Sequence, residues 1–380
     1  MFNRQLNIKS LLEQHSFFLF GPRATGKSSL IQQQLADQVP VFDLLDNTTY
    51  LALSADPGLF SDMLAAYPQA KLFVIDEIQR LPILLNEVHR QIERNHTTFL
   101  LTGSSARTLK RSGVNLLAGR AWQAELFPFT SQEVPNFDLQ RYLQYGGLPP
   151  VWLSPSPEEA LHAYTNTYLK DEIQAEALVR NLPAFSKFLQ LAALTSGAVL
   201  NFSAISNEVG ISVSTIREYY QILEDTFLGF LVPSWQKSVK RKPIATAKFY
   251  FFDTGVRNAL VQNYAIPDKT ELFGNAFEHF IAMELRAYLS YTRKRLPLQF
   301  WQTKHGHEVD FIIGDEVAIE VKSATSLNKN HMKGLNMLQE EGMCKKYFLV
   351  SRDKILRQTD GVLCLHWQEF LTRLWQGELL

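Results

Sequence analysis

A glycine-rich segment near the N-terminus has the residue types and spacing of a loop that binds phosphate. It consists of Gly21, Pro22, Arg23, Ala24, Thr25, Gly26, Lys27, Ser28 and Ser29. The segment follows an apolar run, 17–20, and begins a helical stretch, which is the context that such a loop needs. Glycines let the backbone approach the phosphates, and the N–H groups at a helix start point at the anion. We expect Lys27 to contact the β- and γ-phosphates of ATP and Ser28 to ligate Mg²⁺.

A second apolar run, 72–75, ends in the carboxylates of Asp76 and Glu77. At the end of a buried strand, Asp76 would hold Mg²⁺ through water and Glu77 would polarise the attacking water. The competing interpretation is a strand that ends in a solvated acidic turn. The phosphate-binding pattern upstream favours the catalytic interpretation.

A third apolar run ends in Thr102, Gly103, Ser104 and Ser105. If its strand lies between the strands of the first two motifs, Ser104 is placed to sense the γ-phosphate or the attacking water. Without that strand order, a Gly-Ser pair at a strand end is only a turn.

Arg120 ends a helical stretch just before the β-type run 121–126. An arginine there can reach the nucleotide of a neighbouring subunit, so Arg120 is the candidate finger, with Arg111 and Arg107 as alternatives. The role predicts self-association into a ring or dimer. The competing interpretation is an exposed arginine favoured by the helix dipole.

Four segments together resemble a prokaryotic family of AAA-type ATPases that carry a C-terminal domain of unknown function 4143. They are 76–82, 101–105, 117–120 and the Gly146-Gly147-Leu148-Pro149 motif. The similarity runs over nearly the whole chain. It implies an AAA-type core that hydrolyses ATP and self-associates.

The middle of the chain has the order of a helix-turn-helix. Helical spacing over 185–195 and 202–209 is broken at 210–214 and resumes over 215–227. The predicted core residues are Ile205, Val209, Ile216, Tyr219, Tyr220 and Leu223. The predicted DNA contacts on the recognition helix are Ser212, Ser214, Thr215 and Arg217.

The apolar stretch 228–232 predicts a β-wing with a basic tip formed by Lys237, Lys240, Arg241 and Lys242. Clustered cations beside a helix-turn-helix suit a wing that follows DNA phosphates. Two alternatives remain open, a winged helix that contacts protein and a basic loop that is only solvated.

The last third of the chain carries carboxylates and a lysine in the order of a metal site. These are Glu278, Asp310, Glu320 and Lys322. The strand period of two puts Glu320 and Lys322 on one face. The carboxylates could hold Mg²⁺ or Mn²⁺ and Lys322 could orient a water.

This order resembles the PD-(D/E)xK nuclease fold, with Val309 where the motif has proline. The alternatives are a surface ion pair and a fold that keeps these residues without cutting.

Asp253-Thr254-Gly255 has the look of an aspartic-protease loop, but it occurs once. Because that enzyme needs two such loops, we expect a helix cap here.

Short apolar runs alternate with helical stretches over 1–135, which predicts a parallel sheet covered on both faces. The predicted fold class is α/β, with an AAA-type P-loop NTPase sheet, then a helical and winged-helix domain, then an α/β restriction-endonuclease-like domain. The expected boundaries are 1–135 for the ATPase core, 136–180 for a helical lid or linker, 181–262 for the winged helix and 263–380 for the nuclease-like domain.

The composition, 46% apolar and 20% charged, is that of a folded soluble protein, and no apolar run reaches the ~18 residues of a membrane span. Cys344 and Cys364 stand alone, as buried thiols in a reducing compartment do. We therefore expect a cytoplasmic protein with no membrane partner and no small-molecule substrate besides ATP. A net charge of zero leaves DNA open, since DNA binding needs only a local basic face.

Two functions follow from these motifs. The first is an ATP-driven DNA-processing enzyme that binds DNA through the winged helix and cuts or remodels it. The second is a regulatory ATPase switch whose C-terminal domains bind partners and cut nothing.

Overall fold

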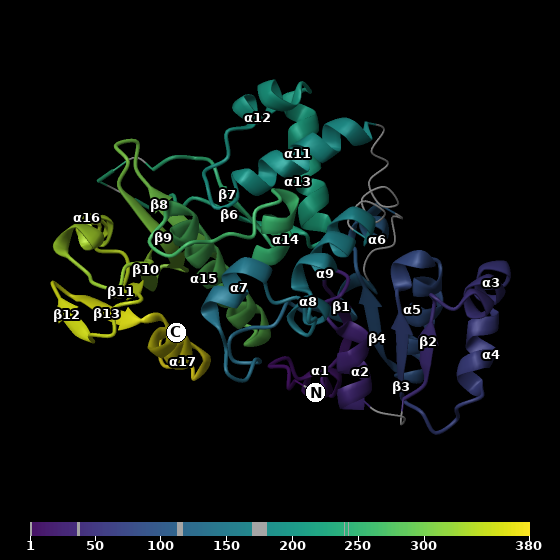
Figure 1. The fold of residues 1–380 in the computed structure, drawn as a ribbon. Coiled ribbons are helices and arrows are strands. Elements are labelled where there is room, and N and C mark those ends of the chain that lie inside the picture. The colour runs from purple at the N-terminus through teal and green to yellow at the C-terminus, as the bar shows by residue number, and fades with distance from the viewer. Residues whose placement is uncertain (1, 36–38, 112–116, 169–180, 239, 242) are drawn as a thin grey trace.

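The N-terminal part of the chain forms a parallel sheet, seen on the right of Figure 1. The computed structural model describes residues 2–35, 39–111, 117–168, 181–238, 240–241 and 243–380. The strands are β1 (Ser16–Phe20), β2 (Val41–Asp43), β3 (Leu72–Asp76), β4 (Thr98–Gly103) and β5 (Ala121–Glu125). Their order is β2-β3-β4-β1-β5, so β4 lies between β1 and β3, as the sensor hypothesis for Ser104 requires. The first three motifs therefore meet at the carboxyl edge of one sheet.

Alternate residues of β1 belong to two different apolar cores, which shows that the sheet is covered on both faces. Phe18 and Phe20 pack in one cluster, whereas Phe17 and Leu19 pack in the other. The covering elements are α1 (Ile8–Leu12), α2 (Lys27–Leu35), α3 (Asn47–Ala55), α4 (Leu59–Ala65), the 3₁₀ turn η2 (Ile78–Arg80), α5 (Leu84–Asn95), α6 (Arg107–Arg111) and the 3₁₀ turn η3 (Leu117–Gly119). This is the predicted P-loop architecture.

The middle region is mostly helical and ends in a two-stranded sheet. Its elements are α7 (Leu139–Tyr145), α8 (Pro149–Trp152), α9 (Pro157–Ala163), the π-helical turn η4 (Tyr164–Tyr168), α11 (Leu182–Leu194), α12 (Phe202–Val209), α13 (Val213–Asp225), β6 (Gly229–Val232), β7 (Lys248–Phe251) and α14 (Thr254–Leu260). Helices α12 and α13 flank a turn at Gly210, whose backbone φ of +83° is left-handed. All six predicted core residues are buried, and β6 pairs with β7 in an antiparallel hairpin, so the helices and strands occur in the order that the predicted winged helix requires.

The C-terminal region is a mixed sheet with helices on both faces. Its elements are α15 (Glu271–Tyr291), β8 (Leu298–Gln302), β9 (Glu308–Ile313), β10 (Val317–Lys322), η5 (Lys329–Met332), α16 (Lys333–Gln339), β11 (Lys346–Ser351), β12 (Arg357–Thr359), β13 (Val362–His366) and α17 (Trp367–Trp375). The strand order is β12-β13-β11-β10-β9-β8. One face packs on α15 and α17, and the opposite face packs on α16.

The wing shares its apolar core with the C-terminal region. Phe230, Val232 and Tyr250 belong to the same cluster as Phe277 and Phe311. The long helix α15 runs between this cluster and the ATPase sheet, and it contacts β5 (Figure 1). The β6–β7 hairpin is thereby fixed on the C-terminal sheet.

Within the part of the chain that the structure describes, no helix has the length and apolar character to cross a membrane.

Candidate functional site

A cavity of about 590 Å³ lies against the glycine-rich loop. The loop forms one wall, and α8 with α9 forms the other. The lining residues are Arg23, Ala24, Gly26, Lys27, Ser28, Ser29, Leu45, Glu77, Pro150, Val151, Ala160, Ala163 and Tyr164. A cavity of this size, polar at one wall and apolar at the other, suits a nucleotide.

The backbone of the loop requires glycine at two positions. Gly26 has φ of +93°, and a Cβ at Gly21 would lie 2.5 Å from the carbonyl oxygen of Leu126. A larger residue at Gly21 would push the loop away from the end of β5. Both glycines are thus required by the loop's own backbone, and the close approach to phosphates stays a prediction.

Lys27 is held inside the loop by two carbonyl oxygens. Its Nζ donates to the oxygens of Gly21 at 2.8 Å and of Pro22 at 3.2 Å. The residue is only 7% exposed although it carries a charge. Carbonyl dipoles hold the ammonium beside the place where phosphates would bind.

Ser28 and Asp76, the predicted Mg²⁺ ligands, are in direct contact. The Ser28 hydroxyl donates to Asp76 Oδ2 at 3.0 Å, and the other carboxylate oxygen accepts from the Thr102 hydroxyl. Hydroxyl and carboxylate oxygens are the hard donors that Mg²⁺ prefers, so this pair fits the ion. Thr102 was not predicted as a site residue, although the sequence places it at the end of the third apolar run.

Glu77 stands at the edge of the same cavity in a left-handed conformation, with φ of 59°. Its backbone N–H donates to the Thr102 hydroxyl at 3.0 Å. Its carboxylate accepts from Ser104 at 3.3 Å and from the Gln79 amide. The structure thus brings the predicted base and the predicted sensor together, and it adds Gln79, which sequence reasoning missed.

Gln79 and Ser104 are themselves joined by a hydrogen bond of 3.1 Å. The contact is tight, because a Cβ at Gly103 would lie 2.7 Å from Gln79 Oε1. Gln79 follows Glu77 by two residues in the sequence, and this spacing was the only available signal for it.

Of the three candidate finger arginines, Arg120 is at the surface. It pairs with Glu93, and its side chain is 35% exposed. Arg107 instead forms ion pairs with Asp225 at 3.4 Å and Glu218 at 3.5 Å, both on α13. Arg107 therefore joins the ATPase sheet to α13, and the side chain of Arg111 lies outside the described residues.

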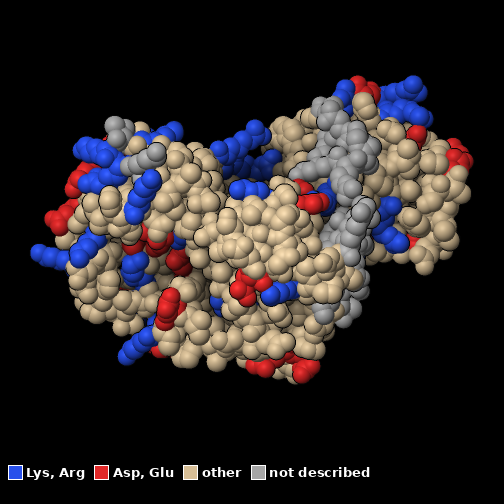
Figure 2. Space-filling model, turned by 90° about the horizontal axis from the view of Figure 1, so that it is seen from above, with Lys and Arg blue, Asp and Glu red and all other residues tan. Residues whose placement is uncertain are grey.

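The predicted DNA contacts lie at the exposed start of α13. Ser212 caps the helix by accepting from the Thr215 N–H at 3.2 Å, and its hydroxyl also contacts those of Ser214 and Thr215. The Arg217 guanidinium lies 4.1 Å from the centre of the Phe202 ring. Figure 2 shows Lys and Arg in several separate groups on the face it presents, interspersed with Asp and Glu.

The predicted basic wing tip is not a free phosphate-binding loop, because its charges pair with the C-terminal region. Lys237 lies 2.6 Å from Asp315, and Arg241 contacts Glu340 and, at 3.4 Å, Glu341. Lys240 donates its backbone N–H to Glu341 at 2.8 Å and its ammonium to the Glu340 carbonyl oxygen. Lys242 lies outside the described residues. The described cations of the predicted wing tip therefore contact groups of the C-terminal region, where contacts to DNA phosphates were expected.

Asp310, Glu320 and Lys322 come together on β9 and β10, in the predicted order. Lys322 Nζ lies 2.5 Å from Glu320 and 3.8 Å from Asp310, and Asp310 also accepts from the Val321 N–H at 2.7 Å. Burial raises the pKa of Asp310, and the charge of Glu278 adds to the shift. Burial likewise raises the pKa of Glu320 well above its usual range.

Glu278 does not complete a metal site with them. It accepts from the Tyr250 hydroxyl at 2.6 Å and pairs at 3.0 Å with Lys248, which also lies 2.5 Å from Glu308. Among the described residues, no three His, Cys, Asp or Glu side chains are placed to hold a metal ion. In this arrangement the ammonium groups of Lys248 and Lys322 lie against the carboxylates, and the expected metal set stays a prediction.

Lys248, Tyr250 and Glu308 were missed by sequence reasoning. The period of two offered a signal, since Lys248 shares a face with Tyr250 on β7 and Glu308 shares one with Asp310 on β9. Only the fold brings the two strands together.

Asp253 is the predicted helix cap, and it also clamps the wall of the nucleotide cavity. Its carboxylate accepts from the Val256 N–H at 3.0 Å on α14 and from the Gly147 N–H at 2.7 Å, just before α8. A Cβ at Gly146 would lie 2.0 Å from Asp253 Oδ1. Burial raises the pKa of Asp253 to about 6, although the backbone N–H groups oppose the shift. The Gly-Gly motif thus lets the cavity wall dock on the winged helix.

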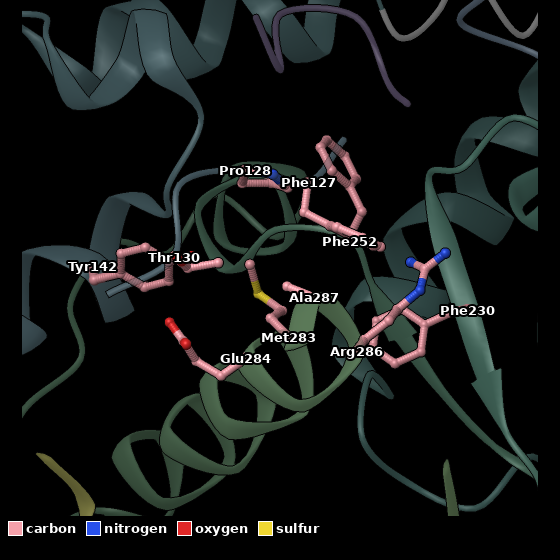
Figure 3. Close-up of a pocket in the computed structure, with 10 residues that line it drawn as sticks. All are labelled: Phe127, Pro128, Thr130, Tyr142, Phe230, Phe252, Met283, Glu284, Arg286 and Ala287. Carbon is pink, nitrogen blue, oxygen red and sulfur yellow. The ribbon is translucent and has the colours of Figure 1, made fainter. Parts of the chain in front are cut away.

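A second buried carboxylate, Glu284, projects from α15 toward the segment that follows β5. It accepts from the Ser131 N–H at 2.6 Å and from the Trp375 indole at 3.0 Å. Figure 3 shows Glu284 and Arg286 projecting from α15 beside the segment 127–130. The cavity there is about 10 Å³, which is roughly the room of one water, so it is no ligand site. Burial raises the pKa of Glu284 to about 7.

Comparison with known families divides the chain into three matched segments. Residues 13–135 match an AAA domain, residues 136–265 match a domain of unknown function, DUF8612, and residues 273–370 match another, DUF4143. The chain thus carries an AAA ATPase domain followed by DUF4143, as the resemblance implied.

Two uncharacterized proteins are similar over most of their length. One, from Haemophilus influenzae, is 26% identical over 79% of this chain and 77% of its own. The other, from Methanocaldococcus jannaschii, is 22% identical over 87% of this chain and 78% of its own. A solved Walker-type ATPase of Pyrococcus abyssi is 16% identical, with a TM-score of 0.44 over 67% of this chain and 93% of that one.

Proposed function

We propose that the protein binds ATP with Mg²⁺ at the glycine-rich loop, hydrolyses it, and uses the cycle to reposition a winged helix that binds DNA. One observation carries the ATPase part. The loop, Ser28, Asp76 and Glu77 meet at one edge of the sheet, beside a cavity of about 590 Å³.

The proposed chemistry uses groups that are already in place. Lys27 would exchange the carbonyl oxygens of Gly21 and Pro22 for phosphate oxygens. Ser28 and Asp76 would hold Mg²⁺, which neutralises charge on the phosphates. Glu77 would exchange its bonds to Gln79 and Ser104 for the attacking water.

The same contacts offer a route from the nucleotide to the winged helix. The cavity wall at α8 is clamped to α14 through Gly147 and Asp253. The sensor strand β4 leads into α6, where Arg107 pairs with Asp225 at the end of α13. A change at the γ-phosphate would thus act on both ends of the winged helix.

DNA is the proposed partner of the exposed start of α13. The capped helix presents Ser214, Thr215 and Arg217, which are residue types that contact phosphates and bases. We further propose that Arg120 acts on the nucleotide of a neighbouring copy, because its side chain is exposed at the surface.

A second candidate is a regulatory ATPase switch that cuts nothing. The position of Lys248 favours it, because its ammonium neutralises Glu278 and Glu308 where a nuclease would hold a metal.

The test is ATP turnover by the full chain with Mg²⁺. Lys27→Ala should lower turnover roughly a hundredfold or more, because a phosphate-binding cation is lost. The matched control is Lys9→Ala, an exposed lysine on α1. Unchanged turnover in Lys27→Ala would refute the ATPase.

DNA binding is tested by fluorescence anisotropy with linear, branched and single-stranded DNA. Arg217→Glu should weaken binding and reduce its dependence on salt, while Arg90→Glu, an exposed arginine on α5, should not. Equal binding by both variants would exclude α13 as the DNA-binding surface.

A further inference from the structure

A buried lysine lies among the carboxylates of the C-terminal sheet. Lys248 is 4% exposed, and its Nζ lies 3.0 Å from Glu278 Oε1 and 2.5 Å from Glu308 Oε1. The negative charge of Asp310 also stabilises the charged form of Lys248. A buried ammonium is stable only with such counter-charges, and the carboxylates equally need a cation.

The lysine and the carboxylates come from different parts of the chain. Lys248 is on β7 of the wing, whereas Glu278 is on α15 and Glu308 is on β9. Tyr250, on the same face of β7, donates to Glu278 and packs in the shared apolar core. The ammonium is therefore fixed by burial of the wing and not by a flexible surface contact.

The ammonium and a divalent ion would compete for the same oxygens. A divalent ion needs several carboxylate or carbonyl oxygens at roughly 2.0–2.6 Å, and two such oxygens lie within 3.0 Å of Lys248 Nζ. Glu320 Oε2, on the neighbouring strand β10, is also buried and has no hydrogen-bond partner among the described residues. Two carboxylate oxygens thus approach one point, and the ammonium of Lys248 occupies that point.

We propose that the Lys248 ammonium is the resident cation of this carboxylate cluster and that it excludes divalent metal ions. The cluster then joins the wing to the C-terminal sheet instead of holding a catalytic metal. Replacing Lys248 by an uncharged residue creates a divalent-cation site. This proposal is independent of ATP binding.

The test is Mn²⁺ binding to the nucleotide-free full chain, followed by the electron paramagnetic resonance signal of free Mn²⁺. Lys248→Met keeps much of the side-chain length and removes the charge, so it should bind Mn²⁺ at least tenfold more tightly than the wild type. Lys237→Met is the matched control, because Lys237 also pairs with a carboxylate, Asp315, but at the surface. Adding Glu278→Gln to Lys248→Met should abolish the gained site, which separates it from any binding at Ser28 and Asp76.

Two results would overturn the proposal. The first is equal Mn²⁺ affinity for Lys248→Met and the wild type. The second concerns the wild type alone and holds even when Lys248→Met fails to fold. If Mn²⁺ raises the thermal unfolding temperature of the wild type, and Asp310→Asn abolishes that rise, then a metal ion enters the cluster while Lys248 is present.

Discussion

The Ser28 hydroxyl donates to Asp76 Oδ2 at 3.0 Å, joining the start of α2 to the end of β3 across the intervening strand β4. The two residues are far apart in sequence and reach each other because parallel strands end at one edge of a sheet. Thr102, on β4, completes the contact by donating to the second oxygen of the same carboxylate. The two proposed Mg²⁺ ligands are thus already oriented before any ion binds.

Asp76→Asn should remove one of these ligands with little change in shape. We expect Mg²⁺-dependent ATP turnover to fall by roughly 10²-fold or more, because the amide carries no charge to hold the ion. The measurement is steady-state turnover over a Mg²⁺ titration. Asp46→Asn is the control, since Asp46 caps α3 at the surface and asparagine is an equally good cap. Equal turnover in the two variants would contradict the proposed role.

Glu77 and Gln79 should separate hydrolysis from ATP binding. Glu77→Gln should lower kcat by roughly 10²–10⁴-fold with ATP affinity retained, because only the polarisation of water is lost. Gln79→Ala removes a hydrogen-bond donor to the Glu77 carboxylate, so kcat should change while KM stays constant. Single-turnover kinetics and equilibrium ATP binding measure the two quantities. A Gln79→Ala variant that alters KM alone would show that Gln79 acts on nucleotide binding.

The ATPase half of the site could be predicted because each motif is local. Gly21 to Ser28 form one loop, and Asp76 and Glu77 follow one buried strand, so pattern and chemistry coincide within a few residues. Thr102 and Gln79 lie in or beside those motifs, but their partners depend on which strands are neighbours. The sensor hypothesis for Ser104 required that β4 lie between β1 and β3. The sheet order β2-β3-β4-β1-β5 meets this requirement.

The C-terminal half was harder to predict because its ion pairs join the segment 237–248 to residues of the C-terminal sheet and its helices. In the sequence, Lys240 and Arg241 have the pattern of a DNA-binding tip. In the structure they contact Glu340 and Glu341. Lys248 looks like a strand residue until the wing docks on α15. The sequence does not show that this basic run contacts an acidic pair about a hundred residues away. The contact depends on how the tertiary structure docks, and not on spacing in the sequence.

Gly146→Ala should disrupt the clamp between the nucleotide cavity and the winged helix. Its Cβ would lie 2.0 Å from Asp253 Oδ1, in a backbone with φ of +73°. Gly306→Ala is the matched control, because φ there is +82° and the space around it is open. The control should lose about 1–2 kcal/mol for the left-handed backbone, and Gly146→Ala should lose roughly 3 kcal/mol or more. Thermal unfolding compares the two, and equal decreases would contradict the clamp.

The buried carboxylate of Glu284 should make stability depend on pH. Burial raises its pKa in the folded protein from 4.5 to about 7, with Glu133 adding to the shift. The folded protein therefore binds this proton more tightly than the unfolded chain does. The resulting stability is fully present below pH 4.5 and is lost as the pH rises through 7, by up to about 3 kcal/mol.

Glu284→Gln removes this titration and should flatten the stability profile between pH 5 and 8. The Gln amide can accept from only one of the two donors, the Ser131 N–H or the Trp375 indole, so it adds a cost that is the same at every pH. Asp253, with a pKa of about 6, titrates in both proteins and cancels in their difference. The measurement is the unfolding temperature of both proteins at pH 5, 6, 7 and 8, with the exposed Glu271→Gln as control. The gap between wild type and Glu284→Gln should change steadily in favour of the variant as the pH rises, and a constant gap would show that Glu284 stays ionised throughout.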